Sequence, residues 1–249
     1  MLYFVEFDLS KWQYSDNLDN NFRVAVGLNN HASTPKIKKI EPHTLKTHKL
    51  KELFAPYYLG RDKDQTITSS KTSRKQKSRG CSFVVLSELV KKGVKVFDLG
   101  CGHDTSLNKL AIENAGGTYL YADLYNQEKE SNIKNIEFGL ENGCDVVMIN
   151  NVLNVIKEDV VRLRLLMQAK SLLKPSGLVV ISIFEGTALV HEKKSNGGSG
   201  ELVPTETKDG WQNRMKTEEY LSEIQSILPE AKVSRVKGCS GKFIVARVS

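Results

Sequence analysis

Several features are scarce or missing in this sequence of 249 residues, and each absence excludes a class of protein. The chain holds no apolar run near the roughly 18 residues that a membrane-spanning helix needs. Its four cysteines form no CxxC pair and its five histidines show no metal-ligand spacing, which argues against disulfide-stapled and metal-bound folds. The start, MLYFVEFDLS, has no basic segment of the kind that opens a signal peptide. We therefore expect a cytoplasmic protein with free thiols, no bound metal and no membrane partner.

Positive charge is present but unevenly distributed. Residues 1–93 contain 17 Lys and Arg against 9 Asp and Glu, whereas residues 94–249 contain 19 against 20. One stretch in the first part has five basic residues and no acid: Lys71, Arg74, Lys75, Lys77 and Arg79. Such a cluster either forms a solvated linker or contacts phosphates by displacing their counterions. The asymmetry predicts a basic appendage on a nearly neutral domain.

The second part of the chain alternates between buried strands and helices. Continuous apolar runs predict parallel strands at VKVFDLG, TYLYADL, CDVVMIN and LVVISIF. Helices are expected in SFVVLSELVKKG, SLNKLAIENAGG, EDVVRLRLLMQAKSLLKPSG and TEEYLSEIQSIL, and a closing antiparallel pair in AKVSRVKG and GKFIVARVS. This order predicts an α/β fold with a doubly wound, mostly parallel, Rossmann-like sheet.

The first 80 residues have a different composition. LYFVEF and RVAVGL predict two short strands, and residues 31–80 are poor in apolar residues and rich in Lys, Thr and Ser. We therefore divide the chain into a basic N-terminal extension at 1–80, with short strands and a linker, and an α/β domain at 81–249.

The turn in KVFDLGCGHDT is the first candidate site. Asp98 precedes Gly100 and Gly102, and ligands of open α/β sheets bind at this end of the strands. A nicotinamide dinucleotide would bring a pyrophosphate, which a carboxylate at the turn repels. In addition, Thr105 stands at the third glycine position of a GxGxxG motif. A nicotinamide oxidoreductase is therefore the least favoured function.

S-adenosylmethionine (SAM) suits this turn better, because it carries an ammonium and a sulfonium and no phosphate. A carboxylate attracts these charges directly or through water, and the glycines let the backbone approach the ligand. Asp123 ends the next predicted strand, where an acid accepts hydrogen bonds from vicinal ribose hydroxyls. The two acids together favour SAM over NAD.

Four motifs in this order resemble the class I SAM-dependent methyltransferases: VFDLGCGHDT, YLYADLY, DVVMINNVLNVI and LLKPSGLVVISIF. The resemblance covers residues 81–249 and implies a sheet of seven strands that includes the C-terminal hairpin. The cofactor-binding residues that it implies are Asp98, Gly100, Cys101, Gly102, Asp123 and Asn150. Asp104 departs from the family, which often has a third glycine there, and this leaves the path of the loop open.

A narrower resemblance concerns NNVLNVI, the KSR and LVKKG stretches before it, and WQNRMKTEEYL. These are similar to methyltransferases associated with DNA phosphorothioation and to phage relatives, which implies DNA or a nucleotide as the substrate. The DPPY or NPPY motif of amino-methylating DNA enzymes is absent, and so is the Pro-Cys dipeptide of cytosine C5 enzymes. A standard DNA base methyltransferase is therefore not expected.

Candidate acceptor residues follow the fourth and fifth predicted strands. Asn151 and Asn154 are the catalytic candidates, because an asparagine can orient an amine nucleophile by a hydrogen bond; for Asn154 the alternative is a helix or turn cap. Trp211 and Arg214 are substrate-binding candidates, and so are the five residues of the basic cluster at 71–79. Trp211 either stacks on a base or packs its loop onto the domain.

We expect a SAM-dependent methyltransferase that acts on an anionic acceptor, namely DNA, RNA or a nucleotide. The alternative is a non-catalytic module with a methyltransferase fold that binds SAM and nucleic acid.

Overall fold

The structure is a computed structural model that describes residues 52–73, 93–186, 204–235 and 242–248. The chain divides into two compact units, Met1–Glu52 and Leu53–Ser249, and every described residue except Glu52 belongs to the second. The two strands expected in the first 30 residues and the helix expected at 81–92 lie outside the described residues.

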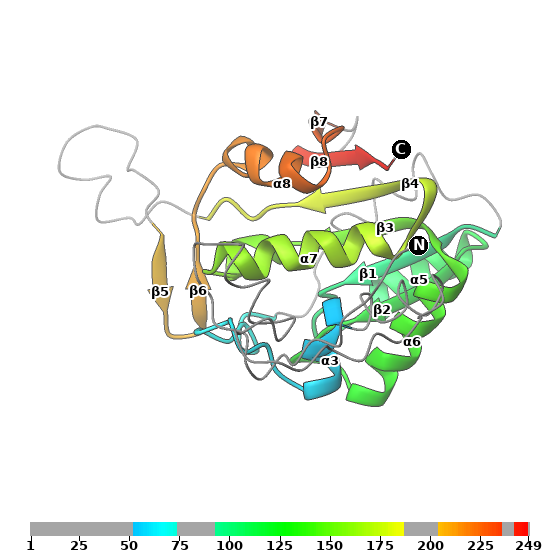
Figure 1. The fold of residues 1–249 in the computed structure, drawn as a ribbon, viewed down its shortest axis with the longest axis horizontal. Coiled ribbons are helices and arrows are strands. Elements are labelled where there is room, and N and C mark those ends of the chain that lie inside the picture. The colour runs from blue at the N-terminus through cyan, green and yellow to red at the C-terminus, as the bar shows by residue number, and fades with distance from the viewer. Residues whose placement is uncertain (1–51, 74–92, 187–203, 236–241, 249) are drawn as a thin grey trace, which may run out of the picture. The chain divides into compact units, whose positions relative to one another are not determined.

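A six-stranded sheet forms the centre of the second unit (Figure 1). Its strand order is β2-β1-β3-β4-β8-β7, and the winding reverses between β1 and β3. The first four strands are parallel, whereas β8 runs antiparallel to both β4 and β7. The strands are β1 (Lys95–Leu99), β2 (Thr118–Ala122), β3 (Cys144–Asn150), β4 (Leu173–Ser182), β7 (Lys232–Arg235) and β8 (Lys242–Arg247). The doubly wound α/β fold and its antiparallel closing strands are confirmed.

The expected seventh strand is not found among the described residues. The segment between β2 and β3, residues 123–143, holds a single long helix, α6 (Lys129–Asn142), which leaves no room for a further strand and helix. β2 therefore has one strand partner, β1, in the described part of the sheet. Its outer side is partly covered, because the Asn135 side chain on α6 donates a hydrogen bond to the Tyr121 carbonyl (2.9 Å).

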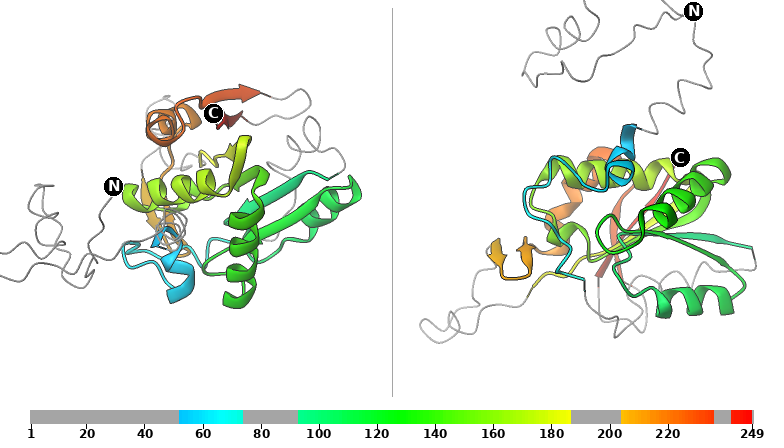
Figure 2. Two further views of the ribbon diagram at one scale, coloured as in Figure 1. Left: turned by 45° about the vertical axis from the view of Figure 1, so that its right-hand side comes forward. Right: turned by 90° about the horizontal axis from the view of Figure 1, so that it is seen from below.

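Helices cover both faces of the sheet (Figure 2). Four of them pack into one core: α3 (Ala55–Leu59), α6, α7 (Asp159–Ser171) and α8 (Leu221–Ile227). α5 (Ser106–Asn114) packs on the opposite face through Ile112. Because side chains alternate along a strand, Phe97 of β1 faces the first core and its neighbour Val96 faces the second.

The end of α7 corrects one boundary. Pro175 and Gly177 are expected to end the helix predicted in EDVVRLRLLMQAKSLLKPSG, but both lie within β4, where Ser176 takes the left-handed φ of 64°. The pairing of β3 with β4 shifts register over this stretch, so that Cys144 pairs with Leu173 and Val146 with Leu178. A β-bulge therefore absorbs the turn residues.

Three short elements sit at the carboxyl ends of the central strands. They are the 3-10 turns η2 (Leu153–Val155) and η3 (Thr217–Tyr220), and the hairpin β5 (Thr205–Thr207) and β6 (Gly210–Gln212). No strand was predicted at residues 205–212, so the hairpin is an addition to the predicted elements. Among the described residues, no helix is long and apolar enough to cross a bilayer, and no group of three metal-ligating side chains occurs.

Candidate active site

The glycine loop joins β1 to α5 and lies against the loop that follows β3. Gly100 and Gly102 both have left-handed φ angles, 79° and 74°, which L-amino acids with side chains adopt at a cost. A Cβ atom on Gly100 would lie 2.5 Å from Cγ2 of Val152. Glycine at this position therefore allows the two loops to touch.

Asp98 lies beneath the glycine loop and does not line the cavity beside it. Its side chain is fully buried on the α5 face of the sheet, where Oδ2 accepts hydrogen bonds from Asn108 Nδ2 (2.9 Å) and the Tyr119 hydroxyl (2.8 Å). Oδ1 is buried and has no hydrogen-bond partner. Burial raises the pKa of Asp98 to about 6, although the two hydrogen bonds oppose this shift. At neutral pH the group is thus mostly ionised, and its charge acts on the loop at short range.

Asp123, at the end of β2, organises the neighbouring turn. Oδ1 accepts hydrogen bonds from the backbone N–H groups of Tyr125 (3.0 Å) and Asn126 (2.9 Å) and from the Asn126 amide, and Oδ2 accepts one from Gly102 N–H (2.9 Å). The carboxylate therefore ties the glycine loop to the β2 turn. Oδ2 has room for a further donor, because a carboxylate oxygen carries two lone pairs.

Cys101 stands between the two glycines. Its thiol is buried, and burial together with nearby Asp98 raises the pKa of Cys101 well above its usual range. The neutral thiol donates weakly to the Gly102 carbonyl (3.4 Å). Its place in the loop is therefore that of a small buried residue and not that of a nucleophile.

Three asparagines follow β3. Asn150 accepts a hydrogen bond from the Ser182 hydroxyl on β4, and Asn151 has a left-handed φ of 57° with an exposed side chain. Asn154 lies in η2 and is buried; its amide nitrogen donates to Gln212 Oε1 (3.3 Å), and its Oδ1 is buried without a partner. Asn150 and Asn151 thus lie at the strand end beside the glycine loop, whereas Asn154 packs beneath β6.

The segment that ends at Arg214 covers the η2 turn. The buried Asn213 side chain donates to the Leu153 and Ile156 carbonyls (both 3.0 Å) and accepts from the Trp211 indole N–H (2.5 Å). The Lys157 ammonium lies 5.0 Å from the centre of the Trp211 ring, within cation–π range. Asn213 was not among the residues singled out from the sequence, because its partners are far away along the chain.

Arg214 lies beside these residues with a left-handed φ of 50°, and its Cγ would lie 3.0 Å from a Cβ on Gly186. Lys71 is exposed at the end of the segment that precedes the glycine loop. The other members of the basic cluster, Arg74, Lys75, Lys77 and Arg79, lie outside the described residues.

A small cavity of about 60 Å³ lies at this end of the sheet. Gly100, Asp123 and Val152 line one side, and Pro56, Tyr57 and Gln65 line the other. The structure thus brings the glycine loop, the β2 acid and the post-β3 loop around one space. The contribution of Pro56, Tyr57 and Gln65 was not expected, since the sequence around them has no recognised motif.

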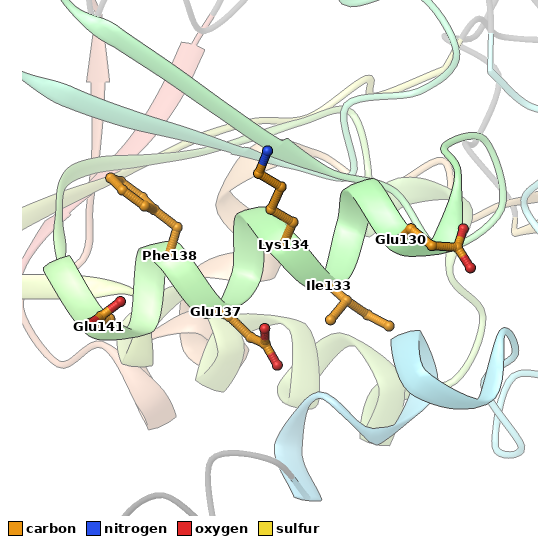
Figure 3. Close-up of a pocket in the computed structure, with 6 residues that line it drawn as sticks. All are labelled: Glu130, Ile133, Lys134, Glu137, Phe138 and Glu141. Carbon is orange, nitrogen blue, oxygen red and sulfur yellow. The ribbon is translucent and has the colours of Figure 1, made fainter.

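A second hollow, of about 450 Å³, lies on α6, and no residue of the glycine loop lines it (Figure 3). Its six lining residues all belong to that helix. Phe138 and Lys134 point to one side of the helix and Ile133 and Glu137 to the other, so their side chains do not converge on a ligand. This hollow carries no catalytic groups and is an exposed helix surface.

One comparison with known families assigns this chain to a described domain. A family described as "Methyltransferase domain" matches residues 62–226. No curated protein matches the sequence. A candidate O-methyltransferase from Nostoc punctiforme has 14% sequence identity and a TM-score of 0.44, with 81% of this chain and 68% of that chain covered.

Two further solved structures are similar at the same low level. A TehB-like SAM-dependent methyltransferase from Corynebacterium glutamicum has 14% identity and a TM-score of 0.38, with 84% of this chain and 100% of that chain covered. An O-methyltransferase family protein from Burkholderia thailandensis has 16% identity and a TM-score of 0.41, with 67% and 55% covered. The match across most of this chain shows that it belongs to the methyltransferase-domain family, the class I enzymes that use SAM.

Proposed function

We propose that the chain transfers the methyl group of SAM to an anionic acceptor bound between the post-β3 loop and the β5–β6 hairpin. The observation that carries this proposal is the meeting of the glycine loop, Asp123 and the post-β3 loop around one cavity. The nearby cations Lys157 and Arg214, together with the basic first part of the chain, favour an acceptor with negative charge.

The residues around the loop fit SAM. Gly100 and Gly102 add no side chain to the loop, and the carboxylate of Asp98 has a buried oxygen without a partner beneath it. Asp98 stabilises a bound cation by its charge, and Asp123 Oδ2 has one lone pair for a ribose hydroxyl. When bound, SAM supplies an electrophilic methyl group on a sulfonium.

Catalysis by this chain consists mainly of alignment. The acceptor atom has to face the methyl group in line with the sulfur, and a protein gains most by fixing that geometry and excluding water. Asn151 is exposed at the strand end and is placed to orient an acceptor by a hydrogen bond. Trp211, held by Asn213 and Lys157, offers an aromatic face for a base.

Nucleic acid or a nucleotide is the acceptor class that combines negative charge with a ring that stacks on Trp211. The test is transfer of labelled methyl from SAM to separated pools of DNA, RNA, protein and small metabolites. Label in the DNA, RNA or nucleotide pool supports the proposal, and label in protein or in uncharged metabolites alone contradicts it.

A matched pair of variants locates the acceptor site. Arg214→Gln should raise the KM for the labelled acceptor about tenfold and leave SAM affinity unchanged, because one charge-assisted contact is lost. Arg235→Gln, on the exposed strand β7, should change neither value. Replacement of the five basic residues at 71–79 by glutamine should reduce the salt dependence of nucleic-acid binding, and an unchanged salt slope would exclude that cluster.

One observation favours a second candidate function, a module that binds SAM and nucleic acid without catalysis. Asn154 is buried with its amide bound to Gln212, and it offers nothing to an acceptor in this arrangement. Protein that binds SAM and labels none of the four pools would support this second function.

A further inference from the structure

Residues 53–73, called here the covering segment, lie across the end of the sheet that holds the glycine loop. This segment begins at α3 and is drawn in cyan and blue in Figures 1 and 2. It carries one wall of the 60 Å³ cavity through Pro56, Tyr57 and Gln65. The cofactor side of the site is therefore closed by a part of the chain that has no motif.

The covering segment contacts the glycine loop directly. Ser73 Oγ accepts a hydrogen bond from His103 N–H (2.9 Å) and lies 2.7 Å from His103 Nδ1. A Cβ on Gly102 would lie 2.6 Å from the same Ser73 oxygen. The Tyr125 hydroxyl, after Asp123, donates to Gln65 Oε1 (2.8 Å). Protein atoms thus occupy the space and the hydrogen-bonding groups that a ligand on this loop would use.

Helix α7 holds the other side of the covering segment. The Arg164 guanidinium forms ion pairs with Asp62 (3.1 Å) and Asp64. Gln168, one turn later, donates to the Leu53 carbonyl (2.8 Å). Glu158, which precedes the helix, accepts from Thr66 N–H (3.1 Å). Arg164 is the member of this set that binds two residues of the segment, so its loss removes two contacts at once.

The size of the cavity excludes SAM from this arrangement. Pockets for ligands of that size enclose about 300–1,000 Å³, whereas the space between the covering segment and Asp123 is about 60 Å³. We propose that the covering segment is a gate that must lift from α7 and the glycine loop before SAM enters, with Arg164 as its latch. This proposal rests on the family's cofactor and is independent of the acceptor.

The rate of SAM association tests the gate, and surface plasmon resonance on the whole protein measures it without any acceptor. Arg164→Gln should raise the association rate constant about threefold, because a partly exposed ion pair adds a modest amount to the stability of the closed form. Asp62→Asn with Asp64→Asn breaks the same latch from the other side and should have the same effect, and it leaves α7 unchanged if Arg164→Gln folds poorly.

The matched control is Lys174→Gln, which removes a partly exposed ion pair between β4 and Asp145 of β3 (3.0 Å) that involves neither the covering segment nor the cavity. It should leave SAM association at the wild-type rate. Equal acceleration in Lys174→Gln would mean general loosening and would overturn the gate. An association rate unchanged in both latch variants would overturn it as well, even if SAM dissociated faster.

Hydrogen exchange gives a readout that does not depend on SAM. In the free protein, the peptide around Thr66 should exchange faster in Arg164→Gln than in the wild type, and peptides from β3 should not change. Equal exchange around Thr66 would show that Arg164 does not hold the segment closed.

Discussion

The two sides of the site are built from different kinds of contact. On the cofactor side, the partners of Asp98 are 10 and 21 residues away along the chain, at Asn108 and Tyr119. On the acceptor side, Asn213 reaches back 60 and 57 residues to Leu153 and Ile156. Asp98 and the glycine loop above it thus form a local unit of one βαβ repeat, whereas the acceptor side depends on a hairpin that lies much later in the chain.

The backbone shows the same contrast. Left-handed conformations on the cofactor side belong to Gly100 and Gly102, which adopt them without strain. On the acceptor side they belong to Asn151 and Arg214, which do not have that freedom. Among the described residues of the two sides, backbone strain thus occurs on the side that is proposed to meet the acceptor, where such strain often accompanies function.

The largest expected effect comes from the point where the two sides touch. Gly100→Ala should lower the free energy of unfolding by about 3 kcal/mol, because the new methyl group meets Val152 in addition to the cost of its left-handed φ. Chemical denaturation measures the loss. Gly93→Ala is the control, since Gly93 has a φ of 88° and no described atom lies within 4 Å of the place its methyl group would take. An equal loss in the two variants would show that the contact between the loops is unimportant.

Asn213→Ala tests the long-range contacts on the acceptor side. It removes two donors and one acceptor from a buried position, so we expect a loss of about 2 kcal/mol in stability. The emission of Trp211 should also shift toward longer wavelength, measured in a Trp12→Phe background. The exposed Asn142→Ala, which removes a single hydrogen bond to Phe138, should do neither. Unchanged Trp211 emission would contradict the role given to Asn213.

Asp98→Asn should separate binding from stability on the cofactor side. Because the folded pKa of Asp98, about 6, lies above its ordinary value of 3.8, the contribution of this group to wild-type stability falls as pH rises from 3.8 to 6 and is level above that. The variant lacks this ionisation, so it should be more stable at pH 7 by about 1–2 kcal/mol, and the gain should vanish near pH 4. Urea denaturation at both pH values measures the difference.

The same variant should bind SAM more weakly, by at least about 1 kcal/mol in a calorimetric titration, because it lacks the negative charge beneath the loop. Unchanged affinity would remove Asp98 from the cofactor site. A variant that is less stable at pH 7 would show that the two hydrogen bonds outweigh the cost of burying the charge.

The smallest expected effect is that of Tyr119→Phe. Loss of the hydroxyl that donates to Asp98 should cost about 1 kcal/mol at pH 7 and less below the pKa of Asp98, because the hydrogen bond favours the ionised carboxylate. Tyr58→Phe, which removes an exposed hydroxyl bound to Glu137, is the control and should have little effect at either pH. Thermal unfolding at pH 7 and pH 4.5 distinguishes the Tyr119→Phe variant from the Tyr58→Phe control.

The difference between local and long-range contacts also explains which features could be predicted from the sequence. Apolar runs ending in Asp98 and Asp123 predicted two neighbouring strands and the edge of the sheet where they end, because each element is encoded locally. The seventh strand that the family resemblance implied is not found among the described residues, because the segment after Asp123 contains a single helix. The covering segment and Asn213 could not be found, since polar contacts over such separations leave no period in the sequence.

A single helix connects β2 to β3, and this leaves β2 at the edge of the described sheet. Among the described strands, β2 lies at the edge of the sheet, and the carbonyl of Tyr121 points outward from this edge. It accepts a hydrogen bond from the Asn135 amide on α6. An outward row of free backbone groups is a template for pairing with the edge of another chain. Because Asn135 occupies one of these groups, the β2 edge of the described sheet is a poorer template for pairing with a second chain.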